Sequence, residues 1–250
     1  MDRGVSNPVE FHDVSYTIDG RLILDRLTFD VPAGETLVLL GRSGSGKTTA
    51  LKMVNRLLTP TSGAVLVDGK ATTAWDPIRL RRRIGYVIQD IGLFPHFTIE
   101  RNVGLVPRLE KWPADRTRTR SEDLLRQVGL DPSLYLARYP RQLSGGQRQR
   151  VGVARALAAD PTILLFDEPF GAVDPVTRLE LQNQFLTLRG KLGKTSIFVT
   201  HDIREALRIG SRVGLLHNGR LEALAKPGDF LKASTDEARA FLACLEEPAV

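Results

Sequence analysis

The stretch Thr36-Leu-Val-Leu-Leu-Gly41-Arg-Ser-Gly-Ser-Gly46-Lys47-Thr48 decides the fold of this chain. Its first five residues form a short apolar run without alternation, which is typical of a strand buried on both faces of a mainly parallel sheet. Gly41 to Thr48 then satisfies the Walker A pattern, and a helical pattern follows over Thr48 to Leu58. This pattern requires a strand before it and a helix after it. The stretch therefore predicts a phosphate-binding loop in an α/β fold.

Each residue type in this loop has a chemical reason to be there. Glycines let backbone N–H groups turn inward around an anion, and the following helix presents the positive end of its dipole. Lys47 is expected to reach the β- and γ-phosphates of ATP, and Thr48 to place its hydroxyl on Mg²⁺. The residues expected to contact the nucleotide are Gly41, Arg42, Ser43, Gly44, Ser45, Gly46, Lys47, Thr48 and Thr49. The loop alone is equally compatible with kinases, GTPases and molecular motors.

A second buried strand ends in two acidic residues. The run Ile163-Leu-Leu-Phe is followed by Asp167 and Glu168. A phosphate loop needs a further metal ligand at the end of a neighbouring strand, so Asp167 is expected to hold Mg²⁺ directly or through water. Glu168 is expected to orient or deprotonate the attacking water. A strand that merely ends in two exposed acidic residues would have the same sequence. The functional interpretation of Asp167 and Glu168 therefore depends on the presence of the phosphate loop.

Length and composition indicate one large domain, or one domain with an inserted lobe. The 250 residues are 42% hydrophobic and 26% charged. The sequence has no apolar run long enough to span a bilayer, and Met1 to Glu10 lacks a signal-peptide pattern. We therefore expect a cytosolic protein that reaches a membrane only through a partner. A single cysteine, Cys244, excludes an internal disulfide and a cysteine-cluster metal site.

The net charge of +6 raises the question of nucleic-acid binding. Much of the excess lies in Arg81 to Arg83 and in Arg138 to Arg155, and the second cluster surrounds a motif with another explanation. Basic surface alone establishes only nonspecific attraction. No specific nucleic-acid partner is expected.

The remaining pattern divides the chain into a sheet-rich core and a helical insertion. We expect a core with a β subdomain over residues 1–90 and 160–225, a helical subdomain over 91–159, and a short helical tail over 226–250. An Asn218-Gly219 pair between two short apolar runs is a strong hairpin signal. The expected strands are Val9–Tyr16, Leu22–Val31, Ile84–Ile88, Ser196–Val199, Val213–His217 and Arg220–Ala225, and the last expected helix is Asp236–Leu245.

The segment Leu143-Ser144-Gly145-Gly146-Gln147, followed by Arg-Gln-Arg-Val-Gly-Val-Ala-Arg, identifies a family. Physically it is a second anion-binding helix start, with Ser144 as N-cap and two glycines that allow close approach to a phosphate. Here the chain resembles the ATPases of ABC transporters, whose signature it matches letter for letter. The resemblance extends from about Val9 to Ala225. It implies the α/β fold of a P-loop NTPase, an ABC-type nucleotide-binding domain with an antiparallel β subdomain and an inserted α-helical subdomain.

The resemblance also implies roles for four further residues. Tyr16 is similar to the aromatic residue that stacks on adenine, although a core tyrosine would look the same. Gln89 is similar to the glutamine that contacts Mg²⁺ or water and senses the membrane partner. Asp174 is similar to the residue of a loop that crosses the subunit interface, and His201 to the histidine at the γ-phosphate.

In this family two copies assemble head to tail. The resemblance therefore implies that Ser144, Gly145, Gly146 and Gln147 of one copy face the phosphate loop of the other across a shared ATP. ATP would draw the copies together, and hydrolysis would release them. The implied activity is ATP hydrolysis coupled to transport across a membrane.

Three segments, Val54 to Gly63, Arg81 to Glu100 and Val106 to Trp112, resemble the osmoprotectant importers, which take up glycine betaine, choline, carnitine and related quaternary amines. The resemblance implies separate permease and substrate-binding chains, and a position on the inner face of the plasma membrane. The permease is expected to dock near Gln89 to Thr98, where Phe94, Pro95 and Phe97 are apolar, unless these rings pack inside the lobe.

Two features differ from that subgroup. Many of its members carry C-terminal regulatory CBS modules, and none fits in Lys226 to Val250, so no ionic-strength switch is expected within this subunit. Asp90 follows the glutamine where relatives often have a second amide. The alternatives are an importer ATPase for another solute, such as an amino acid or polyamine, and a non-transport ABC ATPase that acts on nucleic acid.

Overall fold

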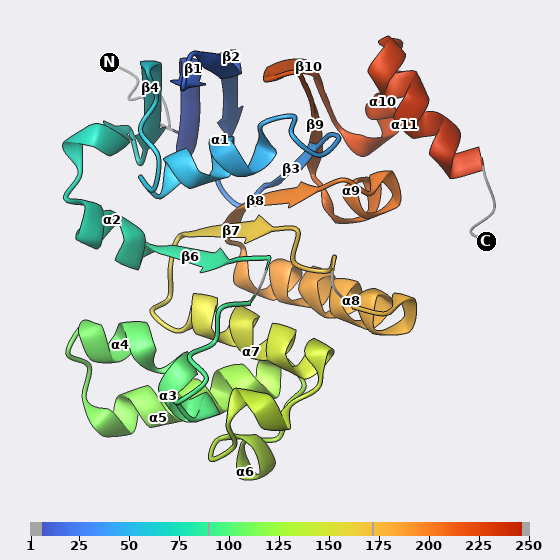
Figure 1. Ribbon diagram of the computed structural model, residues 1–250. Helices are drawn as coiled ribbons and strands as arrows, with labels where there is room; N and C mark the ends of the chain where they lie inside the picture. The colour runs from blue at the N-terminus through green and yellow to red at the C-terminus, as the bar shows by residue number, and fades with distance from the viewer. Residues whose placement is uncertain (1–6, 90, 172, 247–250) are drawn as a thin grey trace. The chain divides into compact units, whose positions relative to one another are not determined.

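The computed structural model describes residues 7–89, 91–171 and 173–246. Its chain forms two units, Met1–Arg81 with Lys194–Val250, and Arg82–Gly193. Figure 1 shows the elements of each unit by label and colour. Asp90, whose difference from the relatives was noted in the sequence, lies outside the described residues.

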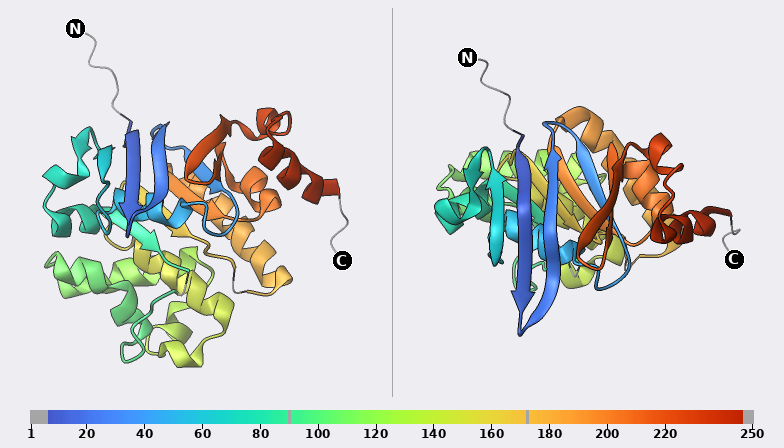
Figure 2. Two further views of the ribbon diagram at one scale, coloured as in Figure 1. Left: turned by 45° about the horizontal axis from the view of Figure 1, so that its top comes forward. Right: turned by 90° about the horizontal axis from the view of Figure 1, so that it is seen from above.

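The first unit contains an antiparallel sheet with the strand order β2-β1-β4-β5. The alternating strands β1 and β2 bury one face, where the rings of Phe11 and Phe29 stack with centroids 4.3 Å apart. Asp19 and Gly20 join these strands, and both have positive φ, as a tight hairpin turn requires. The right view of Figure 2 shows β1, β2 and β4 side by side. The strands are β1 Val9–Ile18, β2 Arg21–Val31, β4 Ser62–Val67 and β5 Lys70–Ala71.

The same unit also contains strands of a parallel sheet. Strand β3 (Thr36–Leu40) lies between β8 (Thr195–Thr200) and β9 (Arg212–His217) and is parallel to both. Every residue of β3 is buried, as its unbroken apolar run predicts. Strand β10 (Arg220–Ala225) pairs antiparallel with β9 across the Asn218-Gly219 turn. The expected strands and hairpin of this unit are thus confirmed.

Helix α1 (Lys47–Val54) is shorter than the expected helix that runs to Leu58. Arg56 adopts a left-handed conformation with φ 52, its N–H donates to Met53 O, and the Leu57 N–H donates to Lys52 O at 2.8 Å. This is a Schellman ending, which satisfies the last carbonyls of the helix. The predicted end was therefore wrong, and Leu57 lies beyond the helix and is 48% exposed.

The other helices of the first unit come after strands β5, β8 and β10 along the chain. Phe230 and Ala238 are fully buried and fix the last two helices against the unit. These elements are η1 Thr72–Ala74, α9 Ile203–Ile209, α10 Pro227–Phe230 and α11 Asp236–Glu246, and α2 Pro77–Arg83 includes the point at which the second unit begins.

The second unit is mainly helical. Strands β6 (Ile84–Val87) and β7 (Ile163–Asp167) pair in parallel, and β7 is buried throughout. The expected insertion, 91–159, is wholly described and holds helices without a strand. Helix α7 contacts α3, α5, α8 and β6, and so forms the centre of the unit. The helices are α3 Ile99–Val103, α4 Leu105–Leu109, α5 Ala114–Gln127, α6 Pro132–Tyr135, η2 Pro140–Gln142, α7 Gly145–Leu157 and α8 Pro175–Leu192.

Within the described part of the chain, we find no helix with both the length and the apolar character that a membrane span needs.

Candidate nucleotide-binding site

The loop between β3 and α1 is curled around the side chain of Lys47. The Lys47 Nζ donates to the carbonyl oxygens of Gly41 and Arg42, both at 2.8 Å, and the side chain is only 4% exposed. Gly44 (φ 80) and Gly46 (φ 102) have left-handed backbones, and Gly46 is the N-cap of α1. The loop thus presents a buried ammonium group and a helix N-terminus, the two features that bind a phosphate.

Strands β2 and β9 pack closely against the glycines of this loop. A Cβ on Gly41 would lie 2.3 Å from the carbonyl oxygen of Leu216 in β9, and one on Gly46 would lie 2.6 Å from Leu24 Cδ2 in β2. The Gly219 N–H donates to Ser45 O at 3.2 Å. Close packing, and not only phosphate access, therefore requires glycine in this loop.

Gly41→Ala is expected to lower the free energy of unfolding by about 3 kcal/mol, because the new methyl group overlaps a fixed backbone carbonyl. Urea denaturation measures this change. The matched control is Gly44→Ala, where no atom lies within 4 Å and only the left-handed backbone, at about 1 kcal/mol, opposes the substitution. Equal losses in the two variants would contradict the packing account.

Tyr16 and His201 lie in the same unit as the loop. Tyr16 is half-buried on β1 and stands opposite Leu24, whose side chain contacts the loop at Gly46. Directly opposed residues project to one face of a sheet, so Tyr16 shares the face that meets the loop. His201 follows β8 and is exposed, and Asp202 caps the helix α9 that begins after it. Thr48 is half-buried in the first turn of α1.

In the second unit, Asp167 and Glu168 end strand β7. Asp167 is 5% exposed and accepts a hydrogen bond from Tyr86 Oη at 3.2 Å. Burial, together with the charge of Asp167, raises the pKa of Tyr86, so this phenol stays protonated and acts as the donor. Glu168 has φ 44, a strained conformation for a non-glycine residue, in a turn closed by the Gly171 N–H. Strain of this kind concentrates at functional sites.

Tyr86→Phe is expected to raise about tenfold the Mg²⁺ concentration needed for half-maximal ATP hydrolysis, because the hydroxyl orients a carboxylate that is expected to hold the ion. A magnesium titration of the hydrolysis rate measures this effect. The control is Tyr139→Phe, at an exposed tyrosine of the same unit. An unchanged magnesium requirement in Tyr86→Phe would show that the hydroxyl does not orient Asp167.

The signature segment forms the N-terminus of α7. Ser144 is its N-cap: Ser144 Oγ accepts from the Gln147 N–H at 3.2 Å, and Gln147 Oε1 accepts from the Ser144 N–H at 2.9 Å. This reciprocal capping box confirms Ser144 as N-cap and gives the Gln147 side chain a structural contact. A Cβ on Gly146 would lie 2.5 Å from Thr177 Cγ2, so α7 and α8 pack closely here.

Asp174 caps the neighbouring helix α8. Its Oδ1 accepts from the Thr177 N–H at 3.0 Å, and this backbone hydrogen bond lowers the pKa of the Asp174 carboxyl. Because Thr177 also contacts Gly146, the second unit brings Asp174 and the signature segment together.

Gln89 is exposed after β6 and precedes a loop with three aromatic rings. Phe94 and Phe97 lie 5.2 Å apart between ring centroids, and His96 contacts both. Asn102 fixes the loop by donating to the Phe94 and Phe97 carbonyls. Phe94 nevertheless remains 40% exposed, so the rings pack on one another and still present an apolar surface.

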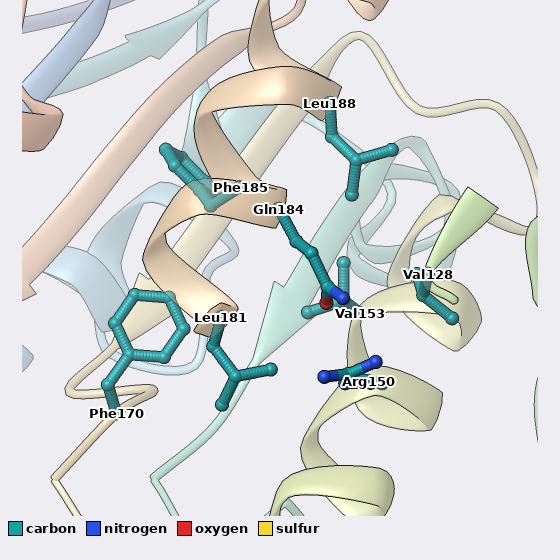
Figure 3. A pocket seen from close by; sticks show the side chains of 8 residues that line it. All are labelled: Val128, Arg150, Val153, Phe170, Leu181, Gln184, Phe185 and Leu188. Carbon is teal, nitrogen blue, oxygen red and sulfur yellow. The ribbon is translucent and has the colours of Figure 1, made fainter. Parts of the chain in front are cut away.

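An apolar pocket in the second unit is lined by none of these residues, although Phe170 in its lining belongs to the turn that follows Glu168. In Figure 3 the side chains of Arg150 and Gln184 approach one another at its edge. Arg150 Nη2 is already paired with Glu180 at 3.0 Å. Six of the eight side chains that line the pocket are apolar. Its lining residues are Val128, Arg150, Val153, Phe170, Leu181, Gln184, Phe185 and Leu188.

The expected site residues thus fall into two sets. The first unit carries the phosphate loop, Tyr16 and His201, and the second carries Gln89, Asp167, Glu168, the signature segment and Asp174. Among the described residues, no group of three or more His, Cys, Asp or Glu forms a metal cluster. Two contacts had no signal in the sequence: the hydrogen bond from Tyr86 to Asp167, and a contact from Glu237 to Arg42 described below.

Comparison with known proteins places this geometry in a family. A family model described as ABC transporter matches residues 24–171. The chain is 52% identical over 214 residues to the osmoprotectant import ATP-binding protein OsmV of Salmonella typhimurium, covering 86% of this chain and 56% of that protein. It is 48% identical over 218 residues to the glycine betaine/carnitine/choline transport ATP-binding protein OpuCA of Bacillus subtilis, covering 87% and 57%. The chain spans little more than half the length of these relatives.

Solved structures give the same result. The dimeric structure of the bacterial ABC transporter cassette MJ0796 matches with a TM-score of 0.78 and 35% identity, over 88% of this chain and 98% of that one. The protein cbiO1 of Clostridium perfringens, part of the ABC transporter complex cbiONQ, matches with a TM-score of 0.82 and 27% identity, over 96% and 99%. The expected P-loop cassette fold is confirmed. Family model, relatives and fold agree that this chain belongs to the ABC transporter family.

Proposed function

We propose that this chain is the ATP-binding and ATP-hydrolysing subunit of an importer for osmoprotectants, quaternary amines such as glycine betaine or choline. The observation that carries the proposal is a curled Walker A loop around Lys47 in a chain 52% identical to an osmoprotectant import ATP-binding protein. The Walker A loop supports the binding and hydrolysis of ATP. The sequence identity to the osmoprotectant import protein supports the class of solute.

In this proposal the first unit binds the nucleotide. Lys47 leaves the carbonyls of Gly41 and Arg42 for the β- and γ-phosphates, which offer it a charge-assisted contact. Backbone N–H groups of the loop and the N-terminus of α1 bind the β-phosphate. Tyr16 stacks on the adenine, and His201 contacts the γ-phosphate.

The second unit supplies the groups for hydrolysis. Glu168 orients or deprotonates the attacking water. Mg²⁺ is a hard cation that takes oxygen ligands, and the Thr48 hydroxyl, the Asp167 carboxylate and the Gln89 amide oxygen fit that preference. Once bound, Mg²⁺ would neutralise charge on the phosphates. The protein's own task at this position is to hold Asp167 in place through Tyr86.

The complete site needs a second copy. In a head-to-tail dimer, the phosphate loop of one copy meets the signature segment of the other. That segment contributes Ser144, Gly145, Gly146 and Gln147, with Asp174 beside them. The N-terminus of α7, with its capped Ser144, offers N–H groups to the γ-phosphate. The dimeric structure of a similar cassette supports this assembly.

Permease subunits are the further partners in this proposal, with a substrate-binding protein acting through them. The exposed Phe94 between Gln89 and Thr98 supports docking there. The chain would then lie on the cytoplasmic face of the membrane, with 91–159 as its helical subdomain, 1–90 with 160–225 as its core and 226–250 as its tail. Crosslinks from Phe94 to a cytoplasmic helix of the permease would support this docking, and crosslinks only within the chain would contradict it.

The solute class is tested with the substrate-binding protein that co-purifies with the transporter. Calorimetric titration is expected to show binding of glycine betaine or choline and none of amino acids or polyamines. If only an amino acid or a polyamine binds, the chain energises a different importer. Magnesium-dependent ATP hydrolysis by this chain tests the activity separately, and its absence would contradict the enzymatic half of the proposal.

A further inference from the structure

Helix α11 reaches the phosphate loop through one acidic side chain. Glu237 Oε1 accepts a hydrogen bond from Arg42 Nε at 2.7 Å, and Glu237 Oε2 lies 3.3 Å from His217 Nδ1. The Glu237 side chain is only 7% exposed. The carbonyl of Arg42 is one of the two that hold Lys47. An acid near the end of the chain is therefore bonded to the residue that holds the Walker A lysine.

Helix α11 is itself anchored at both ends. Its first turn is fixed by Glu237, and near its last turn the carbonyl of Cys244 accepts a hydrogen bond from Arg204 Nη2 at 2.9 Å. Arg204 belongs to α9, which packs against α11. Figure 1 shows α11 beside α9. The helix thus joins the phosphate loop to α9, the helix that begins two residues after His201.

The contact between Glu237 and Arg42 is an ion pair. The hydrogen bond from Arg42 lowers the pKa of the Glu237 carboxyl, although burial acts in the opposite direction, and the charges of Arg42 and His217 lower it further. Glu237 is therefore an anion at neutral pH. Loss of Arg42 would leave a nearly buried carboxylate that still contacts His217 but has lost its arginine partner, so the Glu237 carboxylate depends on Arg42.

We propose that Glu237 is a positioning residue for the phosphate loop: through Arg42 it holds the loop in its curled form, so that α11 sets the affinity for nucleotide. A loop that is ordered before binding loses less conformational entropy when the nucleotide arrives. The inference rests on the proposed function, because it assigns Glu237 an effect on the ATP site. It adds a regulatory role for the C-terminal segment, since whatever displaces α11 also releases the loop.

A positioning role and a simple charge effect predict opposite changes in nucleotide affinity for Glu237→Gln, and the same change for Arg42→Gln. Glu237→Gln removes a negative charge near the phosphates, so electrostatics alone would strengthen nucleotide binding. Arg42→Gln removes a positive charge, so electrostatics alone would weaken it. A positioning role predicts weaker binding in both, because either substitution breaks the pair. It also predicts that the double variant is no worse than a single one.

The experiment is calorimetric titration of the whole chain with ADP and Mg²⁺. Arg42→Gln, Glu237→Gln and the double variant are each expected to raise the dissociation constant about fivefold. For Glu237→Gln, the KM for ATP is expected to rise while kcat at saturation stays unchanged. The matched control is Asp236→Asn, an exposed acid in the same turn of α11, which is expected to stay within about twofold. Thermal melting without nucleotide checks that each variant is folded.

Tighter binding by Glu237→Gln, or additive losses in the double variant, would overturn the positioning role. Lys47→Ala separates this outcome from failure of the proposed function. If Lys47→Ala weakens ADP binding about a hundredfold while Glu237→Gln matches the parent chain, only the inference fails. If the parent chain does not bind ADP, the proposed function fails with it.

Discussion

Glu168→Gln is expected to lower the rate of ATP hydrolysis about a thousandfold, because the amide cannot act as the base for the attacking water. The affinity for ATP is expected to stay within about threefold, since Gln keeps the size of the side chain and the hydrogen-bonding oxygen. Glu168 holds an unusual backbone, φ 44, directly after the buried Asp167, and Gln imposes no new backbone constraint there. The loss should therefore appear in kcat and not in binding.

Phosphate release measures the rate, and titration with an ATP analogue measures the affinity. The control is Glu222→Gln, an exposed acid on β10, which is expected to hydrolyse ATP at the parental rate. A Glu168→Gln variant that retains more than about a tenth of the activity would show that another group is the base.

Lys47→Ala is expected to weaken nucleotide binding about a hundredfold, because a charge-assisted contact to the phosphates is lost. The loss has a second source. Lys47 Nζ also joins the carbonyls of Gly41 and Arg42 at 2.8 Å, so its removal leaves the loop less ordered before binding. Both effects act in the same direction.

Calorimetric titration with ADP measures this change. Lys52→Ala is the matched control, since it removes one positive charge from the same helix without touching the loop. It is expected to bind ADP within about twofold of the parent chain. An affinity of Lys47→Ala close to that of Lys52→Ala would contradict the role of Lys47.

The fold was predictable from local patterns because its central strands and loop carry strong ones. The unbroken apolar run at Thr36–Leu40 indicated a buried strand, and the spacing of glycine and lysine after it indicated the phosphate loop. Ser144 was predictable as an N-cap from its place before the signature helix. Each of these signals lies within about ten residues of what it predicts.

The rest depends on contacts that no local pattern records. Arg42 meets Glu237 across 195 positions, and Tyr86 meets Asp167 across 81, so neither pair could be found from spacing. The early end of α1 was missed for a different reason. An arginine, Arg56, takes the left-handed position where glycine is usual, so no glycine marks the end of the helix.

The central claim is that one chain holds half of a shared ATP site. Its most direct test is the molar mass of Glu168→Gln in solution, measured by sedimentation with and without ATP and Mg²⁺. The account predicts one chain per particle without ATP, two with ATP, and one again when Lys47→Ala is added. A mass of one chain under all conditions, in a protein that still binds ATP, would contradict it.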